Sequence, residues 1–468
     1  MKKILISTFL LSLLLLNGSA SAGELRAGAA KVDITPPPGV SLDGSISKNG
    51  PVSAIHDRLH ARALVLDDGT TRIAIVIVDS CMVAEEVFDG AKQIVHKQTG
   101  FPTDRMLMAA THTHAAPRLI HIGTNPIDDE YHRDATQKIA QAVLQAEKNL
   151  VPAQLGHGSF QLEGLIACRR FLCEPGSVEP NPFGETGERI KSVAGKSSAV
   201  IKPAGPVDPE FSVISVQDHQ GDQIAVLGNF SVHYCGGYRR GLVSADYFGQ
   251  FSEQIQAKLS TTGKLPAIGL MSNGTSGNTG AFQNQGRKFQ PFEGMQYYGR
   301  MMADKTVKLI EELPHNSDLD IAMIQKPLTL HVRKPSAERV EWAKGILADP
   351  DAKTPHRWSR IYANETMHLS KYPETTTIKL QAIRIGDLAI ASAPCEVFAE
   401  SGLALKKASP HPKTIHIELA NGYGGYLPPR EQHELGGYET WPARSSFLEV
   451  DAERKIRETQ LEMLESLK

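Results

Sequence analysis

The sequence predicts an α/β protein built as one large domain, with a mixed sheet and flanking helices. Short runs of β-branched and other apolar residues alternate with longer stretches whose apolar residues recur every three or four positions. Such alternation of strands and helices is typical of sheets with parallel neighbours. Polar turns at 67–69 (Asp-Asp-Gly) and 218–221 (Asp-His-Gln-Gly) instead favour antiparallel hairpins, so the predicted sheet is mixed.

Each predicted element follows from one of these two periodicities. Apolar runs bounded by polar or glycine-containing turns predict strands at 61–66, 73–78, 106–109, 211–216, 223–230, 267–271, 378–385, 388–392 and 414–419. Helical spacing predicts helices at 83–98, 131–149, 247–259, 296–313, 337–349, 396–408 and 450–466. The long polar stretch 174–209 is a predicted loop of the kind that forms lids, binding loops or mobile insertions, and 350–375 is a predicted surface excursion.

The N-terminus has the order of a Sec signal peptide. Lys2 and Lys3 precede an apolar run at 4–16 and the small residues at 20–22. We expect cleavage after Ala22, so that residues 1–22 direct export to the periplasm or the medium and 23–468 form the mature chain. The apolar run is short for a bilayer span and no comparable run follows, so no transmembrane segment is expected.

Charge and cysteine content exclude several classes of protein. The 50 Lys and Arg residues nearly balance the 52 Asp and Glu residues, so the net charge of −2 offers no basic field for nucleic acid. The five cysteines show no CxxC spacing, which argues against a disulfide framework or a zinc ribbon. Cys168 and Cys173 can pair in an oxidising compartment or stay free, and the sequence leaves both possibilities open.

The most informative motif is Thr-His-Thr-His at 111–114, directly after the apolar run 106–110. His112 and His114 would leave an ideal strand on the same face, because side chains alternate with a period of two. Such a pair indicates either a metal or catalytic site or two hydrogen-bonded structural histidines.

Four further motifs follow predicted strands in the same way. His233 precedes a glycine-rich turn, and Glu396 opens a predicted helix whose dipole favours the carboxylate. Asn-Gly-Tyr-Gly-Gly-Tyr occupies 421–426, and a loop of small residues at 272–278 exposes Ser276. Because α/β proteins assemble their sites at strand ends, we expect these segments to meet.

The common order of these motifs resembles the neutral/alkaline ceramidase family of zinc amidohydrolases. The order is THTH, NFSVH with SAD nearby, a serine loop of small residues, APCE, and NGYGGY with a tyrosine downstream. The resemblance begins at 27–36 (AGAAKVDITP), includes 56–66 (HDRLHARALVL) and extends to about Tyr438. It implies the family's N-terminal catalytic domain over 23–468, without the C-terminal β-sandwich domain of the family.

The resemblance also implies a site, residue by residue. It assigns a zinc ion to His112, His233, Glu396 and Tyr426. It assigns catalytic roles to Ser276, His114, Tyr438 and Arg169, with the adjacent Arg170 as the alternative arginine. Two histidines and a carboxylate are a recurrent catalytic zinc set, and a phenolate is a rarer oxygen donor.

The chemistry implied by the resemblance is hydrolysis of an amide bond in an N-acylated small-molecule or lipid substrate, with ceramide as one candidate. Zinc lowers the pKa of bound water and polarises a carbonyl. Ser276, His114 and Tyr438 would position the substrate, stabilise the oxyanion and protonate the leaving amine. Zinc-activated water is favoured over Ser276 as the nucleophile because the serine loop lacks a GxSxG elbow.

Departures from the family pattern predict a smaller or more polar substrate than long-chain ceramide. The family's serine loop reads Gly-Asp-x-Ser-Pro-Asn, whereas 273–278 reads Asn-Gly-Thr-Ser-Gly-Asn. Asn278, Arg118 and Arg239 are the predicted substrate-binding residues, since guanidinium groups suit carboxylates, phosphates or hydroxylated sugars better than alkyl chains.

Two alternative functions stay open. The first is a zinc hydrolase of the same fold that cleaves a glycosidic or ester bond in a polar substrate. The second is a non-catalytic protein that binds zinc or carbohydrate.

Overall fold

The computed structural model describes residues 24–42, 50–122, 128–192 and 198–468. The predicted signal peptide at 1–22 lies outside the described residues, so export and its cleavage site stay predictions of the sequence. Within the described ranges, no helix is both long and apolar enough to cross a membrane.

An eight-stranded mixed sheet forms the centre of the fold, as predicted. Its spatial order is β13-β11-β10-β6-β1-β3-β4-β5. The pairs β4–β5 and β11–β13 are parallel and the other neighbours are antiparallel, including the two predicted hairpins. The bounds are β1 (Arg26–Asp33), β3 (His60–Asp67), β4 (Arg72–Val78), β5 (Met106–Ala110), β6 (Val151–Gln161), β10 (Glu210–Asp218), β11 (Gln223–Phe230) and β13 (Ile268–Asn273).

A second, four-stranded sheet packs face to face against the first. Its order is β14 (Ile321–His331), β15 (Thr375–Ile385), β16 (Leu388–Ser392) and β18 (Lys413–Ile417). One continuous apolar core fills the space between the sheets and includes Ile75, Leu107 and Leu270 from the first sheet with Ile383 and Ile415 from the second. Burial on both faces explains why β4, β5 and β16 are almost wholly apolar.

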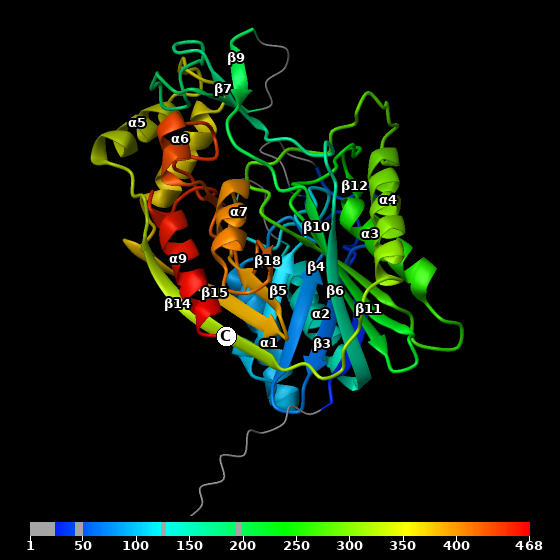
Figure 1. Ribbon diagram of the computed structural model, residues 1–468. Coiled ribbons are helices and arrows are strands. Elements are labelled where there is room, and N and C mark those ends of the chain that lie inside the picture. Colours follow the sequence, from blue (N-terminus) through cyan, green and yellow to red (C-terminus); the bar gives the residue numbers. More distant parts are fainter. Residues whose placement is uncertain (1–23, 43–49, 123–127, 193–197) are drawn as a thin grey trace, which may run out of the picture.

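Helices cover the two outer faces, which gives four layers (Figure 1). The first sheet packs against α1 (Glu85–Thr99), α2 (Asp129–Lys148), α3 (Asp246–Leu259) and α4 (Glu293–Ile310). The second sheet packs against α9 (Ala452–Glu465) and α7 (Ala399–Ala408). Outside these layers lie α5 (Ala337–Ala348), α6 (Ser359–Leu369), α8 (Arg430–Leu435), η1 (Thr103–Arg105), β2 (Ala54–Ile55), β12 (Leu242–Val243) and five short strands described below.

The two predicted loops contain regular structure. Residues 174–209 include β8 (Ile190–Ser192) and β9 (Val200–Pro203), which both pair with β7 (Arg170–Cys173). Residues 350–375 include α6. These two segments and α5 lie together at one end of the molecule, at the top of Figure 1. Cys168 and Cys173 are both free thiols.

The prediction for Glu396 was wrong in its secondary structure. Glu396 and Val397 form the short strand β17 (Glu396–Val397), which pairs in parallel with β19 (Tyr426–Leu427), and α7 begins only at Ala399. Pairing with a strand distant in the sequence overrides the local helical periodicity here. The carboxylate is therefore not held by a helix N-terminus.

Candidate functional site

The predicted site residues follow strands that end at one edge of the two sheets. His112 follows β5, His233 follows β11, and Ser276 follows β13, the parallel neighbour of β11. From the second sheet, Glu396 follows β16 and residues 421–426 follow β18. A bridge between Ala109 and Ala420 joins the edges of the two sheets, so the segments meet as expected.

Three side chains form a buried cluster suited to one metal ion. The Nε2 atoms of His112 and His233 lie 3.0 Å apart, and Glu396 Oε2 lies 3.4 Å and 3.8 Å from them respectively. Donors placed about 2.0–2.2 Å from one tetrahedral zinc ion are separated by similar distances. Glu396 Oε2 is buried and has no hydrogen-bond donor among the described residues, which is a costly state unless a cation binds there. The cluster therefore fits the implied metal.

Neighbouring groups orient these three side chains. His112 Nδ1 lies 2.8 Å from the carbonyl oxygen of Cys81, and the Tyr423 hydroxyl donates to Glu396 Oε1 over 2.8 Å. His112 also has a φ of 75°, an uncommon left-handed conformation that the structure must hold in place. Such outer contacts fix the direction of a metal ligand.

The electrostatic environment keeps the donors in the form that binds a cation. Burial, reinforced by Arg169 and His112, holds the pKa of His233 well below its ordinary value, so this imidazole is neutral. Burial alone would raise the pKa of Glu396, but His112 and Arg169 lower it below the ordinary value, so the carboxylate stays charged. Neutral imidazole and ionised carboxylate are the forms that ligate zinc.

The two predicted tyrosines lie beside this cluster. Tyr426 is the register partner of Glu396 across β17 and β19. Its ring meets that of Tyr438 edge to face, with 5.6 Å between centroids. The guanidinium of Arg169 lies 5.5 Å from the Tyr426 centroid and 5.4 Å from the Tyr438 centroid, which favours Arg169 over Arg170 as the site arginine. Arg170 is fully buried and instead binds Glu439.

His114 and Ser276 complete the group of predicted catalytic residues. His114 Nε2 lies 3.3 Å from His112 Nε2, and its ring stacks on Tyr234 with 4.1 Å between centroids. The serine loop lies against β17, since the Gly277 N–H donates to the carbonyl of Val397 over 2.8 Å. Arg169 donates to the carbonyl of Gly277 over 2.8 Å, so the arginine also touches this loop.

The predicted substrate-binding residues have different surroundings. The Asn278 side chain is buried, accepts from the N–H of Ala399 and donates to Glu400, so its polar atoms hold the start of α7. Arg118 is buried, and its carbonyl oxygen lies 3.0 Å from His132 Nε2. Arg239 is exposed on the turn before β12. Substrate binding by Asn278, Arg118 and Arg239 stays a prediction.

Sequence reasoning missed several residues that shape the site. The Ser276 hydroxyl binds Glu418, whose only local signal is a charged residue at the end of an apolar strand. Tyr423, which lies within the 421–426 motif, binds Glu396. Asp246 accepts from the N–H groups of Cys235 and Gly236 and thereby shapes the loop after His233; its φ of 55° has no local sequence signal.

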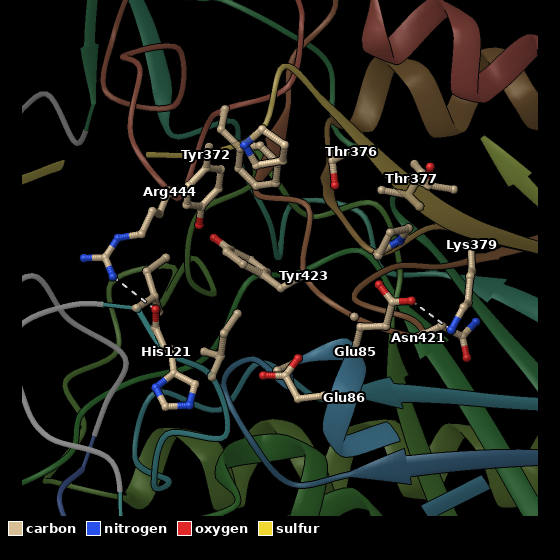
Figure 2. A pocket seen from close by; sticks show the side chains of 18 residues that line it. Glu85, Glu86, His121, Tyr372, Thr376, Thr377, Lys379, Asn421, Tyr423 and Arg444 are labelled. Carbon is tan, nitrogen blue, oxygen red and sulfur yellow. Dashed lines mark hydrogen bonds and ion pairs between the residues drawn. The ribbon is translucent and has the colours of Figure 1, made fainter. Parts of the chain in front are cut away.

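A pocket of about 330 Å³ adjoins the cluster through Tyr423. Figure 2 shows Tyr423 between a hydrogen bond from Arg444 to the His121 carbonyl and an ion pair between Glu85 and Lys379. The pocket is lined by both charged and apolar side chains, and its wall includes the tyrosine that holds Glu396.

The close packing of the serine loop leads to a first prediction. A Cβ atom at Gly277 would lie 2.4 Å from the carbonyl oxygen of Glu396, a contact that neither backbone can relieve without moving. We expect Gly277→Ala to destabilise the fold by roughly 1–3 kcal/mol and to weaken metal binding, because Glu396 must shift. Thermal unfolding and metal content measure the two effects. The control is Gly345→Ala on α5, where a Cβ meets open space and helix propensity should improve; equal behaviour of both variants would contradict the prediction.

Comparison with known proteins decides the family. The sequence profile described as "Neutral/alkaline non-lysosomal ceramidase, N-terminal" matches residues 25–285, which is more than half of the chain. The chain belongs to this family. The resemblance of its motifs is thereby confirmed, and the family match extends through His112, His233 and Ser276.

Individual relatives in the ceramidase family are distant. The neutral ceramidase of Pseudomonas aeruginosa is 21% identical over 91% of this chain and 70% of its own length. Neutral ceramidase B of Dictyostelium discoideum is 24% identical over 56% of this chain, but the match spans only 36% of that protein. The crystal structure of the Pseudomonas enzyme superposes with a TM-score of 0.70 at 18% identity and covers 95% of this chain and 74% of that one. The α/β fold is therefore that of the family.

Proposed function

We propose that the protein is a zinc-dependent hydrolase that cleaves an amide bond of an N-acylated substrate, and that residues 23–468 form its catalytic domain. The observation that carries the proposal is the buried cluster of His112, His233 and Glu396, with one carboxylate oxygen left without a donor. Membership of the ceramidase family supports this reading of the cluster.

Each site residue has a role in this proposal. His112, His233, Glu396 and Tyr426 would hold the zinc ion. Zinc bound there would polarise the substrate carbonyl and lower the pKa of a water ligand. Arg169 is a fixed positive charge near both tyrosines and would help stabilise negative charge that develops on the substrate.

The other polar groups would act on the substrate directly. Ser276 would hold the carbonyl group as it becomes tetrahedral, and Tyr438 would donate a hydrogen bond to the same centre. His114 lies beside His112 and would carry the proton to the leaving amine.

Zinc content together with a substrate screen tests the proposal. The purified protein should hold about one zinc ion per chain, because three or four strong ligands bind zinc tightly. Mass spectrometry would follow ceramides, N-acyl amino acids, N-acetylated sugars, glycosides and esters. Zinc with turnover of an N-acyl compound supports the proposal, whereas zinc with turnover of only glycosides or esters favours the alternative hydrolase. Zinc without any turnover favours the non-catalytic alternative, and a protein without zinc contradicts both zinc hydrolases.

Substrate preference gives a second prediction. The relatives are named neutral ceramidases, but the altered serine loop and Arg118 favour a polar acyl-amide over long-chain ceramide. A guanidinium facing an alkyl chain loses its hydration without gaining a partner, whereas an anionic or hydroxylated group pairs with it. In direct competition, we expect a water-soluble N-acyl substrate to be hydrolysed faster than long-chain ceramide.

The same assay applied to Arg118→Ala identifies the residue responsible. We expect kcat/KM for the polar substrate to fall by about 10-fold, as for the loss of one charge-assisted contact. Arg26→Ala removes an exposed arginine on β1 and serves as the control. Efficient ceramide turnover that Arg118→Ala leaves unchanged would reverse the predicted preference.

A further inference from the structure

We propose that Glu418 is a positioning residue for Ser276, and that its carboxyl group holds the Ser276 hydroxyl in the orientation that turnover requires. The proposal rests on the proposed function, because Ser276 has a catalytic role only in a hydrolase. Its structural part, the coupling between the two side chains, can be measured independently.

The contacts between the two residues are direct and double. Ser276 Oγ donates to Glu418 Oε1 over 2.5 Å, and the Ser276 backbone N–H donates to Glu418 Oε2 over 3.2 Å. The same Oε2 accepts from the N–H of Val397 over 2.8 Å. One carboxyl group therefore ties the serine loop to the strand that carries Glu396.

Backbone contacts fix the position from which Glu418 reaches the loop. Its N–H donates to the carbonyl of Asn273, at the start of the serine loop. The next residue, Leu419, has a φ of 54°, an unfavourable conformation for a branched side chain that turns the backbone sharply after Glu418. The Glu418 side chain is thus fixed at both ends, by its backbone contacts and by the hydrogen bonds of its carboxyl group.

Glu418 differs from the other buried glutamates of the described chain. Glu365, Glu439 and Glu453 each pair with an arginine, at positions 444, 170 and 457. Glu396 faces two histidines. Among the described residues, Glu418 contacts no basic side chain, although it is fully buried. A buried carboxyl group without a cation destabilises a fold, and a glutamine of the same shape would cost less.

The serine loop depends on this external partner. Residues 273–278 contain no carboxylate, and the hydroxyl of Thr275 within the loop is buried without a partner. In the described part of the chain, Glu418 is the one hydrogen-bond partner of the Ser276 hydroxyl. A serine hydroxyl rotates to suit its partner, so Glu418 determines where the oxygen's remaining lone pairs and the proton point.

Glu418→Gln tests the proposal with little change in shape. Both oxygens of the Glu418 carboxyl group accept hydrogen bonds, whereas an amide has one acceptor oxygen, so glutamine cannot accept from both the backbone N–H groups and the Ser276 hydroxyl. We expect kcat to fall by about 10- to 100-fold, as for the loss of other positioning contacts, with KM and zinc content close to those of the unmodified protein. The matched control is Glu453→Gln on α9, which loses a buried ion pair with Arg457 and should retain the unmodified kcat.

A double-mutant cycle separates positioning from a structural role. If Glu418 acts through Ser276, adding Glu418→Gln to Ser276→Ala should lower kcat by less than about twofold further. An equal loss of kcat in both backgrounds, or an unchanged kcat in Glu418→Gln alone, would overturn the proposal.

Urea unfolding of the unmodified protein, the two single variants and the double variant tests this proposal separately from the proposed function. The shifts in midpoint of the two single variants should not add up in the double variant, because the side chains are in contact. If the unmodified protein hydrolyses none of the substrates, the proposed function fails, and additive midpoint shifts would then refute the coupling as well. Non-additive shifts would support the coupling on their own.

Discussion

His233→Ala is expected to lose most of the bound zinc and all measurable turnover. The substitution leaves one histidine and one carboxylate of the buried cluster, together with Tyr426, which is too few strong ligands for tight binding. Removal of an outer contact alone costs about 10–100-fold in metal affinity, so loss of a ligand should exceed 100-fold. Metal analysis after dialysis against a weak chelator measures this affinity directly.

Thermal unfolding provides a second measurement for the same variant. An ion present at about 1,000 times its dissociation constant stabilises the folded state by about 4 kcal/mol, and His233→Ala should lose this response to added zinc. His416→Ala is the matched control, because His416 is equally buried but binds Gln460 instead of the cluster. This control should unfold at a lower temperature yet keep its zinc; undiminished zinc in His233→Ala would refute the assigned site.

Ser276→Ala is expected to retain zinc and its fold while kcat falls by about 10²–10³-fold, the usual loss when one transition-state hydrogen bond is removed. Ser276 binds Glu418 and lies on a loop whose backbone contacts Val397, so we expect its hydroxyl to support the reaction and not the metal. Steady-state kinetics and metal content from the same preparation check both parts.

Thr275→Val is the matched control for the serine variant. Thr275 is buried on the same loop and its hydroxyl has no partner in the described structure, so its replacement by valine removes no hydrogen bond. We expect zinc content and kcat to stay close to those of the unmodified protein. Loss of zinc in Ser276→Ala would show that the serine supports the metal instead of the reaction.

Local patterns predicted most of the fold. Each predicted strand and helix corresponds to an observed element, because burial of one face or of both imposes a periodicity that a short segment displays by itself. The strands β1, β6 and β14 were not predicted. β6 contains Gly156 and Gly158, where a Cβ would collide with Pro314 and Leu313. Close packing against this distant segment requires glycines at positions where a predictable strand would have apolar side chains.

The residue types of the candidate site were also predictable from local patterns. His112, His233, Glu396 and Ser276 were recognisable because each is a reactive residue type placed directly after an apolar strand. The order of these motifs was enough to indicate the family, since order and residue type are properties of the chain alone.

Tertiary structure alone decided how these groups contact one another. It placed Glu396 on β17 instead of a helix, used the Asn278 amide to hold α7, and brought Glu418 onto Ser276 from 142 positions away. No local pattern records such contacts, because the energy of a buried hydrogen bond or a buried charge depends on the partner that the fold supplies. The residue types of the site can therefore be predicted from the sequence. Their partners and protonation states follow from burial and from contacts between distant segments.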